Sequence, residues 1–234
     1  MKKSSRSLRA PDSKVRRIPH TQSEIIRAAK KRLSVITREF TDGFRFIGRY
    51  PRSVTFFGSA RFKEDDEHYG QARSLATKLS KAGYAVMTGG GPGIMEAGNR
   101  GAIEGGGASI GINIKLPGEQ VLNPYTTDSM EFYYFFSRKV VLSFSAEAYI
   151  FFPGGFGTLD EFFEIVTLVQ THKIPKVPII LVGSDYWKPL DAFIKKTVYE
   201  KHGAIDKADM KLYYITDDEA AVVRRVKKAP QRPN

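Results

Sequence analysis

The apolar residues of this chain follow two alternating patterns, which together predict an α/β fold. Short apolar runs typical of strands alternate with segments whose apolar residues recur at helical spacing. The runs expected to be strands are residues 54–57, 84–87, 109–114, 148–152, 177–182 and 212–215. The expected helices are residues 67–81, 94–104, 130–145, 158–171, 189–199 and 217–227, with a loop at 115–129. This alternation predicts a parallel sheet covered by helices on both faces.

The first part of the chain has a different character. Residues 1–22 are polar and basic and are expected to be disordered, whereas 23–52 predict a helix and a linker. Ser23 is the expected cap of this helix, which should run over about residues 24–46. Its apolar positions must pack on the body or on a partner chain. The globular domain is therefore assigned to residues 53–221 and a basic tail to 222–234.

Charge is distributed unevenly along the chain, whose net charge is +12. Residues 1–52 hold 15 Lys and Arg against 4 acids, and 222–234 hold 5 against none. The remaining residues hold 17 against 21. The basicity thus belongs to the two ends, which are interpreted either as solvated tails or as binding segments for nucleic acid or an acidic partner.

Several classes of function are excluded or disfavoured by composition. The chain has no cysteine, which rules out disulfides, Cys–zinc sites and thiol catalysis and fits a cytoplasmic location. No apolar run is long enough to span a membrane, and the basic N-terminus lacks the apolar region of a secretory signal. The four histidines follow no metal-ligand spacing. We therefore expect neither a metal nor a cofactor.

Glycine-rich turns follow three of the expected strands. They are Gly58-Ser59, Gly89–Gly93 and Pro153–Thr158. The carboxyl ends of parallel strands meet at one edge of a sheet, where ligands bind, so all three turns should line one site. Residues 88–93 contain neither a dinucleotide fingerprint nor a phosphate-binding Gly-Lys-Ser/Thr ending. Ser59, Gly90 and Gly91 are candidate ligand contacts, although a tight strand-to-helix turn would also explain the glycines.

The turn at Pro153–Glu161 has two interpretations. Thr158 and Glu161 have the spacing of a capping box, in which both side chains would cap the helix start. That motif does not explain Gly154, Gly155 and Gly157 together. Glycines let backbone N–H groups approach a ligand, and a helix N-terminus favours an anion. In this second interpretation an anion replaces the cap and Glu161 is free for catalysis.

Arg138 and Lys139 lie in an otherwise apolar predicted helix. They are either a surface pair with buried stems or cations at the sheet edge. In the second case Arg138 would meet a phosphate or orient Glu161.

These motifs together resemble the Lonely Guy (LOG) family. Pro153 and the run Gly154-Gly155-Phe156-Gly157-Thr158-Leu159-Asp160-Glu161 match its P-G-G-x-G-T-x-x-E signature, and Arg138-Lys139 matches its upstream Arg-Lys pair. The turn at 88–95 resembles its glycine-rich turn. The similarity covers about residues 53–200, and the basic N-terminal extension is absent from the short plant-type enzymes.

The resemblance implies a doubly wound, Rossmann-like fold and at least a homodimer. It implies that Arg138 and Glu161 are catalytic. The implied substrate contacts are Lys139 and Thr167, the loosely aligned Glu119, and the phosphate-holding Gly154, Gly155, Gly157 and Thr158. The implied reaction is hydrolysis of the N-glycosidic bond of AMP or a cytokinin riboside 5′-monophosphate, giving free base and ribose 5-phosphate. The alternative is a protein that binds a nucleotide, an anionic cofactor or single-stranded nucleic acid without turnover.

Overall fold

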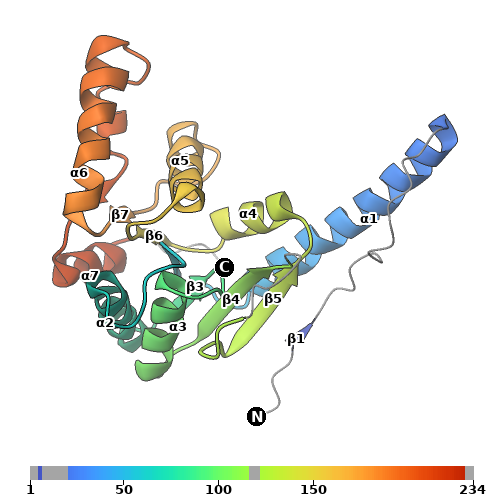
Figure 1. Ribbon diagram of the computed structural model, residues 1–234, viewed down its shortest axis with the longest axis horizontal. Helices are drawn as coiled ribbons and strands as arrows, with labels where there is room; N and C mark the ends of the chain where they lie inside the picture. The colour runs from blue at the N-terminus through green and yellow to red at the C-terminus, as the bar shows by residue number, and fades with distance from the viewer. Residues whose placement is uncertain (1–4, 7–20, 116–121, 230–234) are drawn as a thin grey trace.

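A parallel sheet with helices on both faces forms the body of the protein (Figure 1). The computed structural model describes residues 5–6, 21–115 and 122–229. Its strands run in the order β1-β5-β4-β3-β2-β6-β7-β8, and every neighbouring pair is parallel. The α/β, Rossmann-like fold with an N-terminal helix that the sequence predicts is therefore confirmed.

The elements have the following bounds. The strands are β1 Ser5–Arg6, β2 Ser53–Phe57, β3 Ala85–Thr88, β4 Ser109–Ile114, β5 Asp128–Phe132, β6 Ala148–Phe151, β7 Ile179–Leu181 and β8 Tyr214–Ile215. The α-helices are α1 Gln22–Ile47, α2 Glu67–Lys81, α3 Ile94–Glu104, α4 Phe135–Ser143, α5 Phe156–Gln170, α6 Ser184–Phe193 and α7 Glu219–Lys227. A π-helical segment, Ile194–Lys201, continues α6, and a 3₁₀ turn spans Asp209–Lys211.

The sheet separates two hydrophobic cores. Successive residues of a strand point to opposite faces, so Val54 and Phe56 of β2 pack under α2, α3 and α7, while Phe57 packs on the other face. That second face is covered by α4, α5, α6 and the last turns of α1, which contribute Phe46 and Ile47. Helices on both faces leave the strand ends as the exposed edges, and a site must form at one of them.

The strand order fixes where that site lies. The chain runs outward from β2 through β3 and β4 to β5, then returns to β6 beside β2 and continues to β7 and β8. The strand order reverses between β2 and β6, and the carboxyl ends of the strands at such a reversal are the usual ligand position in open α/β sheets. The turns at Ser59 and Pro153 follow these two strands.

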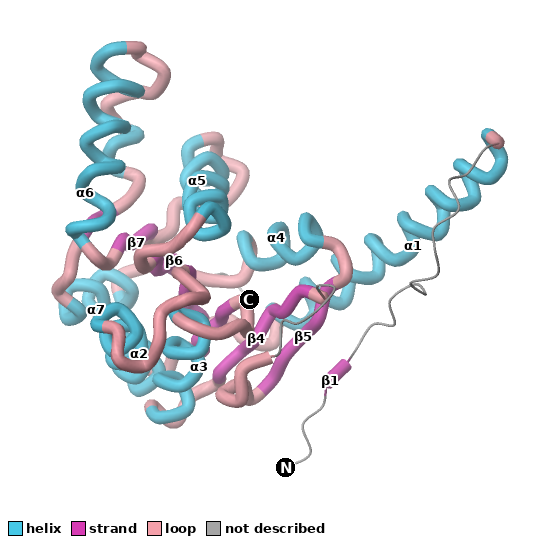
Figure 2. Tube along the Cα trace, in the orientation of Figure 1, coloured by secondary structure: helices cyan, strands magenta, loops and turns pink. Residues whose placement is uncertain are grey.

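The N-terminal helix is longer than the sequence predicts, and its cap differs. The expectation that Ser23 caps it is wrong: Thr21 is the cap, and its hydroxyl accepts from the N–H of Glu24 at 3.2 Å. The Glu24 side chain accepts from the N–H of Thr21 in return, which completes a capping box. The first half of α1 extends away from the sheet (Figure 2).

Two other expectations need correction. A loop at 115–129 and a helix at 130–145 were expected, but Asp128–Phe132 forms strand β5 and the helix begins only at Phe135. Pairing with β4 over five residues outweighs the weak local pattern of this segment. The helix expected at 189–199 begins earlier, at Ser184, and passes into the π-helical segment. The expected disorder of 1–22 falls mostly outside the described residues.

Candidate active site

Three glycine-rich turns are bonded to one another at the carboxyl edge of the sheet. The N–H of Ser59, after β2, donates to the carbonyl of Pro153, after β6, at 2.9 Å. The carbonyl of Ser59 accepts from the N–H of Ile94, the first residue of α3, at 3.0 Å. The structure therefore brings the predicted turns together at the carboxyl ends of β2 and β6.

Some of the glycines serve the turns themselves. A Cβ on Gly93, whose φ is +68°, would lie 2.3 Å from the carbonyl oxygen of Ser59, and one on Gly154 would lie 2.1 Å from Thr158 Oγ1. Gly90 has a φ of +75°, its N–H donates to Thr88 Oγ1, and its carbonyl accepts from the N–H of Asn123. The carbonyl of Gly91 accepts from Asn123 Nδ2 at 3.0 Å. These contacts give the glycines at 90 and 91 a structural role in the turn.

Gly155 and Gly157 have no such structural reason. Among the described residues, a Cβ added to either would meet no heavy atom within 4 Å, and neither has a positive φ. Gly157 lies in the first turn of α5, where glycine costs up to about 1 kcal/mol relative to alanine. Glycine is therefore present at a position where a side chain would fit and would favour the helix. Open space at both residues leaves the backbone accessible to a ligand.

The start of α5 is free of side-chain caps. The helix begins at Phe156 with Gly155 as its cap residue, and within the described part of the chain no side-chain cap bonds to this end. Thr158 therefore lies inside the first turn and not at the cap position, and the capping box of Thr158 and Glu161 is not formed. The first N–H groups of a helix have no partner within the helix and carry positive partial charge. This end can therefore accept an anion.

Glu161 is a buried carboxyl group next to this helix start. Its side chain is 6% exposed, and its Oε2 atom is buried without a hydrogen-bond partner among the described residues. Burial raises the pKa of Glu161 to about 7, and nearby Lys139 opposes the shift while Glu164 adds to it. A carboxyl group with this pKa can hold or release a proton at neutral pH, as a general acid or base requires.

Arg138 reaches the same edge from α4. Its Nε donates to the carbonyl of Ile112 at 2.7 Å, and its Nη2 lies 3.5 Å from the carbonyl oxygen of Gly89. A Cβ on Gly89 would lie 2.3 Å from that Nη2, so glycine at this position makes room for the guanidinium. Burial lowers the pKa of Arg138, and the charge of Glu161 opposes this shift. The two side chains form no ion pair among the described residues, so Arg138 does not orient Glu161 by direct contact here.

A residue that the sequence analysis missed supports the helix carrying Arg138. Glu39 of α1 is fully buried, and its carboxylate accepts from the N–H groups of Tyr133 and Tyr134 and from the hydroxyl of Ser137. It thereby caps the N-terminus of α4, which has no cap of its own. In an amphipathic sequence this glutamate resembles an ordinary surface residue. No local pattern in the sequence distinguishes it.

The remaining predicted residues have varied positions. Lys139 pairs with Asp160 at 2.6 Å and with Glu164 at 3.0 Å, so its ammonium group is bonded to two acids of α5. Thr167 is exposed two turns along that helix. Glu119 lies outside the described residues. Within residues 21–115 and 122–229, no group of three His, Cys, Asp or Glu side chains is arranged to hold a metal ion.

Comparison with known proteins identifies the family. A family model described as "Possible lysine decarboxylase" matches residues 95–226, more than half of the chain, and includes Arg138 and the whole turn at 153–161. The chain belongs to this family. The family resemblance predicted from the sequence is therefore confirmed.

None of the helices in the described ranges is both long and apolar enough to cross a bilayer.

Curated relatives within this family are nucleotide-cleaving enzymes by name. A rice protein named "Probable cytokinin riboside 5'-monophosphate phosphoribohydrolase LOGL5" is 33% identical over 65% of this chain and 62% of its own length. The "Pyrimidine/purine nucleotide 5'-monophosphate nucleosidase" of Escherichia coli K12 is 28% identical over 78% of this chain and 42% of its own length. The match thus spans less than two thirds of either relative.

Solved structures share the fold of this chain. The molybdenum cofactor carrier protein of Chlamydomonas reinhardtii has a TM-score of 0.55 at 22% identity, and covers 76% of this chain and 97% of its own. The molybdenum cofactor binding protein of Rippkaea orientalis has a TM-score of 0.54 at 18% identity, covering 75% of this chain and 93% of its own. At these identities the likeness concerns the architecture.

Proposed function

We propose that this protein hydrolyses the N-glycosidic bond of nucleoside 5′-monophosphates, such as AMP or a cytokinin riboside 5′-monophosphate, to the free base and ribose 5-phosphate. The observation that carries the proposal is the buried Glu161 carboxyl, with an unbonded oxygen and a pKa of about 7, next to the uncapped start of α5. The names of the relatives within the family support the same reaction.

In this proposal the start of α5 holds the 5′-phosphate. The backbone N–H groups near Gly155 and Gly157 bind the phosphate oxygens, because no described side chain caps this helix end and no described atom lies within 4 Å of a Cβ added to either glycine. Thr158, which is largely buried in the same turn, lies within the phosphate cradle. Anchoring the phosphate fixes the ribose relative to Glu161, which lowers the entropic part of the barrier.

The chemistry follows from the charge that develops on the sugar. As the bond between C1′ and the base nitrogen breaks, the ribose takes on oxocarbenium character, which a nearby carboxylate stabilises. The Glu161 carboxylate then takes a proton from the attacking water, whose oxygen forms the new bond to C1′. The departing base nitrogen takes up one proton, and Glu161 gives back the proton that it took from water, directly or through solvent. One water is consumed, the carboxylate is regenerated, and the products are the neutral base and anionic ribose 5-phosphate. The guanidinium of Arg138 offsets negative charge on the phosphate or on the departing base.

The alternative is a binding protein that holds a nucleotide or an anionic cofactor at the same sheet edge without turnover. Two structural neighbours are titled as carriers or binders of the molybdenum cofactor, at identities that reflect fold alone. A carrier has no need of an unbonded carboxyl poised near neutral pH, so Glu161 favours the enzyme. Turnover separates the two functions.

The test is a panel of nucleoside 5′-monophosphates incubated with the full chain, with free base detected by chromatography. Adenosine is the matched control, because it lacks only the phosphate. We expect base release from at least one monophosphate, and a kcat/KM for AMP about 100-fold or more above that for adenosine. Tight binding of monophosphates without base release would instead support the carrier.

We also propose that the protein is a cytoplasmic homodimer or higher homo-oligomer. Support for assembly comes from aromatic side chains exposed on α4 and α5, among them Phe135, Phe136 and Phe163. Exposed apolar clusters of this kind are typical of interfaces.

Support for the cytoplasmic location comes from the absence of cysteine. Light scattering on the purified chain would give its mass in solution, and a monomer at micromolar concentration would contradict the assembly. Binding of nucleic acid by the basic ends remains a weaker proposal, which rests on charge alone.

A further inference from the structure

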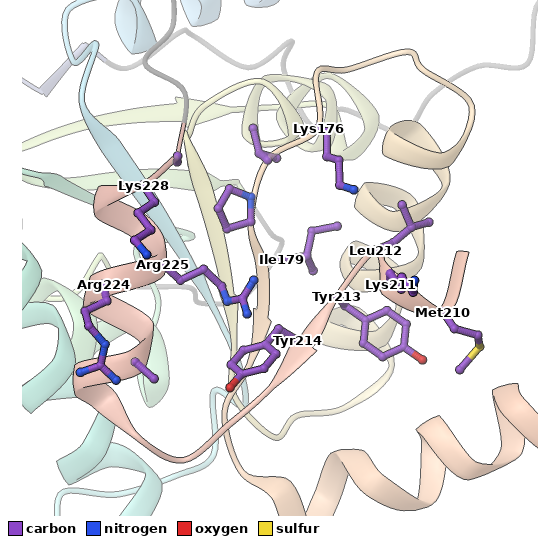
Figure 3. Close-up of a pocket in the computed structure, with 14 residues that line it drawn as sticks. Lys176, Ile179, Met210, Lys211, Leu212, Tyr213, Tyr214, Arg224, Arg225 and Lys228 are labelled. Atoms are coloured by element: carbon purple, nitrogen blue, oxygen red, sulfur yellow. The ribbon is translucent and has the colours of Figure 1, made fainter. Parts of the chain in front are cut away.

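A cavity lies at the opposite edge of the sheet from the glycine turns. It is lined by the residues that lead into β7 and β8 and by the last turns of α7, and its volume is about 820 Å³ (Figure 3). Because the strands are parallel, their starts lie at the edge away from the glycine turns that follow β2 and β6. This cavity, called the groove from here on, is therefore separate from the candidate active site. Its size is typical of small-molecule sites.

The groove gathers positive charge from three separate segments. Lys176 precedes β7, Lys211 belongs to the 3₁₀ turn, and α7 supplies Arg224, Arg225 and Lys228. None of the fourteen lining residues is an acid. In Figure 3, Arg225 and Lys228 reach into the groove from α7, while Lys176 enters from the other side. Cations that face one another across a groove repel, and an anion between them removes that repulsion.

The cations have few competing partners. Arg224 pairs with Asp218 at 3.3 Å, but both side chains are more than half exposed, so this pair contributes little. Across the described ranges, no ion pair is formed by the other four cations. The guanidinium of Arg225 lies 3.9 Å from the centre of the Tyr214 ring, and this cation–π contact holds it in position before any ligand arrives.

The floor of the groove is apolar. Val177 and Ile179 lead into and form β7, and Leu212 faces them from the segment before β8. A ligand that suits this lining combines several negative charges with an organic part that covers the floor. A single carboxylate or phosphate would leave most of the five cations unpaired.

We propose that this groove binds a small organic molecule carrying two or more linked phosphate groups. A polyphosphate chain places three or more charges within a few ångströms, which matches cations approaching from both sides. Arginine and lysine together suit phosphate oxygens, since the guanidinium binds them in pairs and the ammonium binds as a point charge. The site is independent of the hydrolysis proposed above, and neither requires the other.

The test measures binding of inorganic tripolyphosphate and of ATP to the full chain by calorimetry at about 150 mM salt. The double variant Arg225→Gln/Lys228→Gln removes two groove cations. Lys227→Gln is the matched control, because Lys227 is exposed on the same helix but does not line the groove. We expect the double variant to weaken both ligands about tenfold or more, and the control to change affinity less than about twofold. ATP should bind more tightly than tripolyphosphate if the floor takes up the organic part.

Three outcomes would overturn the proposal. The first is no saturable binding of either ligand by the wild-type chain. The second is an equal loss in the Lys227→Gln control, which would show only diffuse attraction to a basic helix. The third is binding of a single-stranded oligonucleotide of about 12 residues at least tenfold more tightly than tripolyphosphate, with that binding lost in the double variant. The groove would then be a nucleic-acid surface. Thermal unfolding of each variant shows whether it is folded.

Discussion

At the residue scale, Glu161 links stability to pH. Burial raises its pKa from 4.5 to about 7 in the folded chain, so the folded state holds this proton more tightly than the unfolded state. The stabilisation of the folded state by this proton is fully present below pH 4.5 and is lost as pH rises through 7. Its size is about 3 kcal/mol. The unfolding free energy of wild type should therefore fall between pH 4 and pH 8 by about this amount more than that of Glu161→Gln.

Urea unfolding of both proteins at the two pH values measures this difference. Lys139, Glu164, Arg138 and Asp160 act on Glu161 and are present in both chains, so the comparison isolates one carboxyl group. Parallel stability profiles for the two proteins would mean that Glu161 is charged without penalty in the folded chain.

Gly157 offers a second test at this scale. Gly157→Ala should stabilise the protein by about 0.5–1 kcal/mol, because alanine is the better helix residue and the site has room for its methyl group. The same methyl group should raise the KM for AMP, since it occupies the space assigned to the phosphate.

Gly70→Ala is the matched control: Gly70 lies in α2 and also has no described heavy atom within 4 Å of an added Cβ. It should give a similar gain in stability and an unchanged KM. An unchanged KM in both variants would remove Gly157 from the binding site.

At the scale of elements, α1 and α4 act as a unit through Glu39. Its carboxylate accepts from Tyr133, Tyr134 and Ser137 at the start of α4, and Arg138 follows in the next position of that helix. Glu39→Gln removes the negative charge and replaces one accepting oxygen with an NH2 group, which cannot accept the hydrogen bonds donated by the start of α4. We expect a loss of about 2 kcal/mol in unfolding free energy and a lower kcat. Glu24→Gln changes an exposed cap of the same helix and should cost no more than about 1 kcal/mol. Equal losses in the two variants, with unchanged kcat, would contradict the role of Glu39.

The sequence predicts the elements that have strong local signals. Apolar runs that end in glycine gave strands and turns at nearly their observed positions, and the parallel topology then brought the three turns to one edge. Strand β5 was missed because Asp128–Phe132 has few apolar residues and its neighbours 133–145 are rich in aromatics. Its place comes from pairing with β4, which no local pattern reveals.

The site was predicted in the same uneven way. The spacing of Thr158 and Glu161 predicts either a capping box or an anion site, and the start of α5 at Phe156 excludes the capping box. Arg138 stood out as a cation in an apolar helix. Glu39 gave no such signal, because its burial depends on backbone N–H groups about a hundred residues along the chain. Pairing and capping across such separations are set by the assembled fold.

At the scale of the whole molecule, α1 divides into two parts. Its first turns carry exposed Ile25, Ile26 and Leu33, whereas Phe46 and Ile47 belong to the core. Deletion of residues 1–34 should leave unfolding free energy within about 1 kcal/mol of wild type. Deletion of residues 1–45 removes Glu39 and Gly43, which packs on Val141 and Phe132, and should unfold the chain. Circular dichroism with thermal melting checks both. A stable product from the longer deletion would show that α1 is an appendage of the domain.

The proposed reaction depends on the carboxyl group at position 161, and the most direct measurement is adenine release from AMP by Glu161→Gln and by wild type. Glutamine keeps the size of the side chain but can neither carry the charge nor take a proton. The account predicts a fall in kcat of about 100-fold or more with the variant folded. Activity within about threefold of wild type would contradict it.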